Sequence, residues 1–162
     1  MQTGLSAQEI FNWAGQAATI GWLFLIFLPH RIKPIFFVPQ YLIPLGLGLV
    51  YSGLALSRYF VIQGGYNSLE QVSLLFEDEF MLLAGWLHYL AFDLFIGAWI
   101  AKQSDQLGLS RLLQAPILIA TFMFGPVGLV IFFCIKGGVY ALENKASAPS
   151  ITDNASQEQT HV

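Results

Sequence analysis

Four long apolar segments constrain the fold of this chain more than any other feature of its sequence. They cover about residues 10–28, 40–60, 80–101 and 113–135. A helical crossing of a bilayer needs about 20 mostly apolar residues, and in lipid a segment must satisfy its own backbone hydrogen bonds. Each segment is therefore predicted to be a transmembrane helix. Pro126 lies inside the last segment and is predicted to kink it.

The composition agrees with a membrane protein. Hydrophobic residues make up 56% of the chain and charged residues only 10%, whereas soluble domains carry roughly 25% charged residues. The net charge of −3 argues against a nucleic-acid partner. Cys134 is the single cysteine and lies in an apolar run, so we expect it to act as a small packing residue.

The predicted fold is all-α: a polytopic membrane protein built as a bundle of four transmembrane helices. Residues 1–145 form this one domain, and the polar, unpatterned residues 146–162 are predicted to be a disordered tail. The longest connection joins the second and third helices. Within it, Asn67 or Ser68 is a candidate N-cap for a short amphipathic helix that we expect at the membrane surface.

The basic residues give a weak prediction of orientation. Loops with more Lys and Arg tend to be cytoplasmic. Four basic residues flank the first and third connections, and three lie near the second connection and the C-terminal flank. The count places the first and third connections in the cytoplasm and both ends of the chain on the opposite side. The first nine residues show no targeting pattern, which favours a prokaryotic or already mature chain.

Two ionisable residues, His88 and Asp93, lie near the middle of the third segment. A charged group at the centre of a bilayer costs at least about 2.5–3.5 kcal/mol on insertion scales, so such residues usually face a protein interior and mark function. Asp93 and Glu79 share one helical stripe within about 40°, whereas His88 lies about 140° from Asp93. We therefore expect a ligand or a second helix to lie between the imidazole and the carboxylate.

The first two segments add polar residues that would complete an interior. With Asn12, Gln16 and Tyr51 facing inward, these side chains and the His88 and Asp93 groups would surround one cavity. Each has an ordinary explanation as well: amides hydrogen-bond between membrane helices, and tyrosines pack. The spacing of the His and acidic residues matches no standard metal signature, so no metal site is predicted. A lone histidine is still compatible with haem ligation.

These residues also carry a family resemblance. Glu79, Trp86, His88 and Asp93-Leu94-Phe95, followed by Gly125-Pro126-Val127-Gly128, resemble the abscisic-acid-deficient-four-like membrane proteins. The likeness extends from about residue 12 to 138 and is sharpest from 79 to 97. The plant member of that family is implicated as neoxanthin synthase, which isomerises an epoxycarotenoid. The resemblance implies a multi-pass protein of the plasma or thylakoid membrane that acts in carotenoid and xanthophyll metabolism.

Opening an epoxide to an allenic alcohol requires an acid for the oxygen and a base for a carbon-bound proton, and no electron carrier or other cofactor. In this hypothesis Asp93 or Glu79 is the acid and His88 is the base. The remaining candidates would bind the substrate: Trp86, Tyr51, Tyr89, Asn12 and Gln16. The partners are then the lipid bilayer and a carotenoid-like hydrophobic molecule, and a homo-oligomer is left open.

Two other functions are compatible with the sequence. One is a non-catalytic membrane module that binds a carotenoid, quinone or haem. The other is a small transporter or assembly factor in which the two ionisable groups relay protons. No inverted repeat is evident, which disfavours a transporter.

Overall fold

The computed structural model describes residues 5–28 and 33–147, and every regular element in this part of the chain is helical. The all-α prediction is thereby confirmed. The predicted disordered tail lies almost wholly outside the described residues. The elements are α1 (Ala7–Phe27), α2 (Lys33–Phe37), the π-helix η1 (Val38–Leu42), α3 (Ile43–Arg58), α4 (Leu69–Leu75), α5 (Glu79–Gln106), α6 (Arg111–Phe124) and α7 (Pro126–Ser147).

Four helices in the described residues are long and apolar enough to cross a membrane, as predicted. The first is α1, and the second is the continuous helix Ile35–Arg58, which contains η1 and α3. The third is α5, and the fourth is the Pro126–Ala146 part of α7. α5 is the most buried of the four. Many large apolar side chains are exposed, among them Leu49, Phe60 and Leu112, which is the surface that lipid requires.

Polar caps fix where the helices begin. Ser6 accepts a hydrogen bond from the Glu9 N–H, and the Glu9 carboxylate accepts one from the Ser6 N–H, so α1 starts with a capping box. Ser68 caps α4, as one of the two predicted N-caps. Asp78 caps α5 through the Met81 N–H at 2.9 Å and also lies 3.9 Å from the Arg58 guanidinium at the end of α3.

Small residues bring α1 and α5 into close contact. A Cβ on Gly97 would overlap the Trp22 indole, and a Cβ on Gly21 would overlap Leu94. Small residues at such positions let membrane helices approach and gain dispersion contacts. The bulky side chains Trp22 and Leu94 fill the space above these glycines and belong to the main core cluster.

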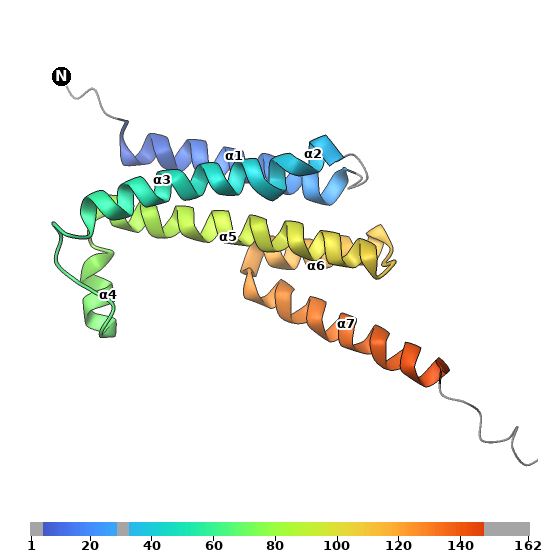
Figure 1. Ribbon diagram of the computed structural model, residues 1–162. Helices are drawn as coiled ribbons and strands as arrows, with labels where there is room; N and C mark the ends of the chain where they lie inside the picture. Colours follow the sequence, from blue (N-terminus) through green and yellow to red (C-terminus); the bar gives the residue numbers. More distant parts are fainter. Residues whose placement is uncertain (1–4, 29–32, 148–162) are drawn as a thin grey trace, which may run out of the picture.

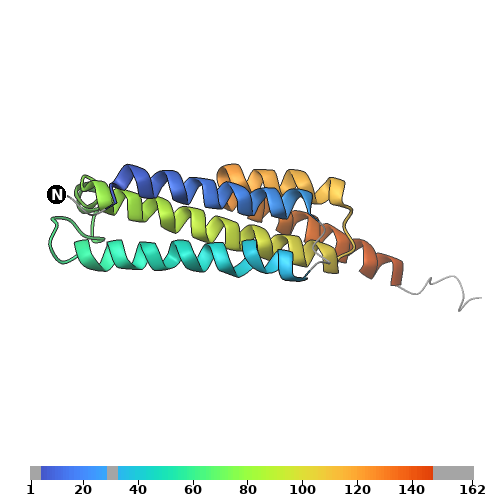
Figure 2. The ribbon, with the colours of Figure 1, turned by 90° about the horizontal axis from the view of Figure 1, so that it is seen from above.

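Three long helices run side by side along the molecule: α1, the α2–η1–α3 helix and α5 (Figure 1). α4 stands across their axes at one end (Figure 1). α3 and α6 lie on opposite sides of α5 (Figure 2). α5 therefore presents one face to α3 and another to α6, and this arrangement decides which of its polar residues can meet.

The fourth predicted segment is not one helix. The structure breaks it at Gly125, which has a positive φ of 43°, and separates α6 from α7. Pro126 begins α7, a position where its missing N–H leaves no helix bond unmade. Thr121 and Gly128 touch across the break, and a side chain on Gly128 would overlap Thr121. The prediction of a kinked helix over 113–135 is wrong, because a glycine in this conformation allows the chain to reverse.

The break turns α6 and α7 into a helical hairpin whose tip lies about halfway along α5 (Figures 1 and 2). α7 then runs back toward the end of the molecule where α5 finishes (Figure 1). The described end of α7 therefore lies opposite the start of α1. The predicted orientation in the membrane, with both chain ends on one side, stays a prediction.

Candidate functional site

Asp93 meets the tip of the α6–α7 hairpin. Its position at the centre of the 28-residue α5 places it about 20 Å from either end of that helix. A Cβ added to Gly125 would lie 2.6 Å from one Asp93 carboxylate oxygen, so the carboxylate packs directly on the glycine backbone. The other oxygen, Oδ2, is buried and has no hydrogen-bond partner among the described residues. A buried carboxylate oxygen without a partner is costly and calls for an explanation.

Tyr89 precedes Asp93 by one helical turn and interacts with its carboxyl group. The Tyr89 hydroxyl also donates to the Met123 carbonyl of α6 at 3.5 Å. Carbonyls at the end of a helix have no partner within it, and at membrane depth such groups need a protein partner. Tyr89 therefore connects the carboxyl group to the broken end of α6.

An aromatic stripe extends from this point along α5 toward its N-terminal end. The Trp86 ring stacks on Tyr89 with 5.3 Å between ring centroids, and Phe11 of α1 lies 5.9 Å from Trp86. Because α6 ends at the middle of α5, no helix of the described chain covers this half of the α1–α5 surface on the α6 side (Figure 2). The stripe therefore forms an open apolar surface that ends at the Asp93 carboxyl.

Two hollows shape this surface, and we call them together the α1–α5 groove. One, of about 340 Å³, includes Glu79, Phe11 and Trp86. The other, of about 490 Å³, adjoins it on the surface of α1 and is lined by α1 residues alone, among them Asn12, Gly15 and Gln16. Phe11 belongs to both. The groove thus has an acidic entrance at the start of α5, amide side chains along one wall and the aromatic stripe leading toward Asp93.

The structure divides the predicted site residues into two groups. Four of them line the α1–α5 groove: Glu79, Trp86, Asn12 and Gln16. Tyr89 and Asp93 line neither hollow, but they continue the stripe from Trp86 along α5. His88 and Tyr51 lie on the α3 side of α5, with ring centroids 5.3 Å apart in an edge-on contact.

The single cavity predicted for these residues is therefore not formed by them. Asn12 and Gln16 are exposed on α1, and His88 is exposed beside Phe92, with 4.6 Å between ring centroids. The reason is the helical rotation between His88 and Asp93, about 140° for five positions. α3 packs on one side of α5 and the hairpin on the other, so the imidazole and the carboxylate face different neighbours.

Sequence reasoning missed three components of the site. It did not identify Phe11, whose ring continues the aromatic stripe, or Gly15, which leaves space along the groove. It also treated Gly125-Pro126 as a kink rather than as the contact of Asp93. A glycine followed by proline marks turns as well as kinks, so this pair and a carboxylate at mid-membrane were together a sequence signal for a contact between them.

A family model for the ABA DEFICIENT 4-like proteins matches residues 9–132, from the start of α1 through the hairpin tip into α7. The chain belongs to the ABA DEFICIENT 4-like family. Membership indicates a membrane protein related to carotenoids or xanthophylls. Neither a curated protein nor a solved structure matches the chain. The hairpin tip and most of the α1–α5 groove lie within the part of this ABA DEFICIENT 4-like protein that the family model covers.

Proposed function

We propose that this protein isomerises an epoxycarotenoid, with the chemistry at the hairpin tip. The observation that carries the proposal is the unpartnered Asp93 oxygen at the centre of α5, next to an aromatic stripe that leads to the hollow lined by Glu79 and Trp86. A long polyene dissolves in lipid and would reach such a groove from the side. Aromatic rings such as Trp86 and Phe11 offer it flat apolar contact.

The reaction requires one proton to leave carbon and one to reach oxygen. In our proposal the Asp93 carboxylate removes the proton from the polyene carbon next to the epoxide. The electrons of that C–H bond form a new C=C bond as the neighbouring C–O bond breaks, and the Tyr89 hydroxyl protonates the released oxygen. Asp93 then returns its proton to Tyr89, so the product is an isomer of the substrate and both side chains are restored.

This assignment changes the roles proposed from the sequence alone. His88 was the expected base, but it lies on the α3 side of α5, beside Tyr51 and away from the hairpin tip. Glu79 was an alternative acid, but it lies fourteen positions before Asp93, which is about 21 Å along the helix. In our proposal Glu79 receives the polar end of the substrate at the groove entrance, and Asn12 and Gln16 contact its length.

The test is conversion by the purified protein. Protein in nanodiscs would be incubated with an epoxycarotenoid. The pigments would then be separated by chromatography, and their masses would be measured by mass spectrometry. We expect a new pigment of unchanged mass from the wild-type protein and none from Asp93→Asn. A pigment that is retained tightly but never altered would instead support a binding module and contradict catalysis.

One feature supports a second candidate function. Broken helices whose ends meet an ionisable residue at mid-membrane are typical of secondary transporters, and the Gly125 break beside Asp93 has this arrangement. The candidate is a proton-coupled transporter. Proton flux into liposomes that depends on Asp93 without any pigment change would favour transport over isomerisation.

A further inference from the structure

The opposite side of α5 carries a second groove that the proposed reaction does not use. One hollow of about 450 Å³ opens at the end of α5, where Lys102 and Gln106 lie, and is walled by Phe36 and Phe37. A second hollow, of about 520 Å³, continues between α3 and α5. The two hollows share Gln40 and Tyr41, and we call them together the α3–α5 groove.

The backbone is distorted where the two hollows join. Gln40 and Tyr41 belong to the π-helix η1, with Pro39 in the same turn. Single π-turns within α-helices are rare and occur frequently at functional sites. The wider turn places an amide and a phenol at the shared wall of the groove, between its polar mouth and its apolar interior.

The groove changes character along its length in the way that an amphipathic ligand requires. Its mouth has the Lys102 ammonium and the Gln40 and Gln106 amides, with aromatic residues typical of the membrane interface. Asp105 also lines the mouth, but its carboxylate accepts a hydrogen bond from Gln114 at 2.8 Å. The inner part is walled mainly by apolar side chains such as Leu45 and Phe95.

The length of the groove matches a single lipid leaflet. From Gln106 at the mouth to Ala91 at the inner end is fifteen positions of α5, or about 22 Å. A bilayer with its head groups is about 40–45 Å thick, so one leaflet is about half of that. A molecule that spanned both leaflets would need about twice the length that the groove provides.

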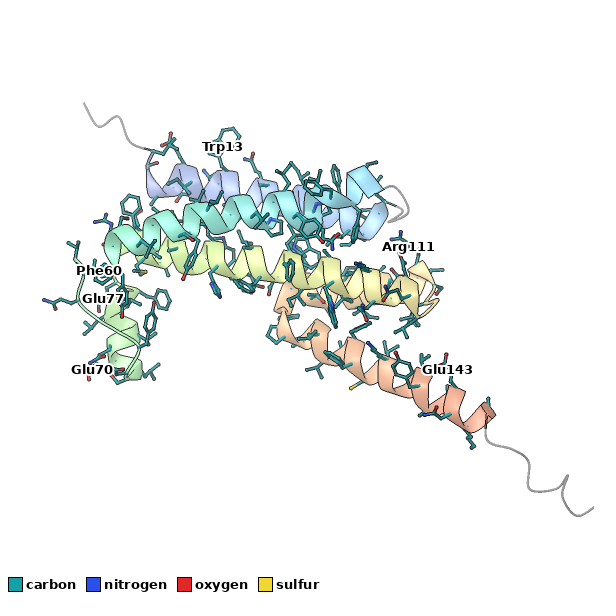
Figure 3. The ribbon with its side chains drawn as sticks, in the orientation of Figure 1. Trp13, Phe60, Glu70, Glu77, Arg111 and Glu143 are labelled. Carbon is teal, nitrogen blue, oxygen red and sulfur yellow. The ribbon has the colours of Figure 1, made fainter. Side chains whose placement is uncertain are left out.

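The charge at this end of the molecule selects the head group. Arg111 lies at the same end as the groove mouth, and Glu143 of α7 lies toward that end as well, whereas Glu70 and Glu77 lie at the opposite end (Figure 3). Basic sites between membrane helices on the cytoplasmic side bind anionic head groups. We propose that the α3–α5 groove binds one anionic phospholipid, with its phosphate at Lys102 and an acyl chain along α3 and α5.

Gly48 makes this proposal testable. It lines the inner part of the groove, and a Cβ placed on it would meet nothing within 4 Å. Gly48→Leu therefore places a bulky side chain in the groove from a backbone position that accepts a Cβ without contact. Gly53, also on α3 and also open, is the matched control because it does not line the groove. Leu45→Trp is a second way to fill the same space should Gly48→Leu fail to fold.

The experiment is native mass spectrometry of protein released from nanodiscs of equal parts phosphatidylglycerol and phosphatidylcholine. We expect wild type and Gly53→Leu to retain one phospholipid with a preference of about fivefold for phosphatidylglycerol. Lys102→Gln should retain a lipid without that preference, and Gly48→Leu should retain neither. The proposal is overturned if wild type shows no preference for phosphatidylglycerol, or if both groove-filling variants retain lipid as wild type does. It is also overturned if those variants lose a bound pigment and not a phospholipid.

Discussion

The two sides of α5 contain similar residue types but have different architectures. On one side, Asp93 meets a broken helix that stops at mid-membrane, and one oxygen of its carboxylate, Oδ2, lacks a hydrogen-bond partner among the described residues. On the other side, His88 packs against Tyr51 of α3 and the neighbouring Phe92 ring. An ionisable residue near the middle of a span is therefore not enough to identify chemistry. Its neighbours decide whether it lies against an unfinished helix end or within an aromatic cluster.

The largest expected effect compares the two ionisable residues directly. Asp93→Asn should lower the rate of pigment conversion at least about 100-fold, the usual contribution of a general acid or base. His88→Gln should lower it less than about threefold, because its neighbours are aromatic and remain packed. Conversion by each purified variant, measured at saturating pigment, gives the ratio. Loss of activity in His88→Gln together with full activity in Asp93→Asn would show that His88, on the α3 side, is the base.

The next prediction concerns the helix break. Gly125→Ala should reduce the free energy of unfolding by about 1–3 kcal/mol, because an L-residue is strained at a φ of 43°. Its methyl group would also press on the Asp93 carboxylate. Thermal unfolding in detergent measures the change. Gly53→Ala on α3 is the control, and it should be at least as stable as wild type, because alanine favours a helix over glycine by up to about 1 kcal/mol. Equal stability of the two variants would mean that the fold does not depend on the glycine conformation at the helix break.

Substitutions of aromatic residues on the two sides of α5 should differ in their effect on KM, by a smaller factor. Trp86→Leu removes the ring that connects Phe11 to Tyr89 and should raise the KM for the pigment by about tenfold, since a stacked aromatic contact is worth about 1 kcal/mol or more. Phe92→Leu, beside His88, should leave KM within about twofold of wild type. Steady-state kinetics of the two variants test this, and equal effects would remove the distinction between the sides.

The smallest effect is expected at the groove entrance. Glu79→Gln keeps the shape and polarity of the side chain, which lies about 21 Å along α5 from Asp93. Its kcat should therefore stay within about twofold of wild type, and any change should appear in KM. A large fall in kcat would show that Glu79, rather than Asp93, takes part in the proton transfers.

The features of the fold that depend on short sequence signals could be predicted. Ser68 was one of two candidate caps, and its hydroxyl does cap α4. The long apolar segments indicated helices because few other structures can span a membrane. The reversal at Gly125 could not be separated from a kink, because Pro126 permits both and only the packing of α6 on α5 selects one.

The sequence indicated polar and aromatic candidates on α1, α3 and α5, but it did not indicate how they are grouped. The rotation between His88 and Asp93 followed from their spacing, and the structure agrees with it. Which neighbour lies on each side of α5 depends on tertiary packing, such as the contact of Trp22 with Gly97. That packing joins residues distant in sequence, so no local pattern indicates whether α3 or α6 faces a given side chain.

The central claim, that the pigment occupies the hairpin side of α5, is tested most directly by filling each groove in turn. Gly15 lines the α1–α5 groove and Gly48 the α3–α5 groove, and a Cβ on either glycine meets nothing within 4 Å. The measurement is the KM for the epoxycarotenoid in Gly15→Leu and Gly48→Leu. We predict an increase of at least about tenfold in Gly15→Leu and less than about twofold in Gly48→Leu. The reverse order would contradict the claim and place the substrate beside His88.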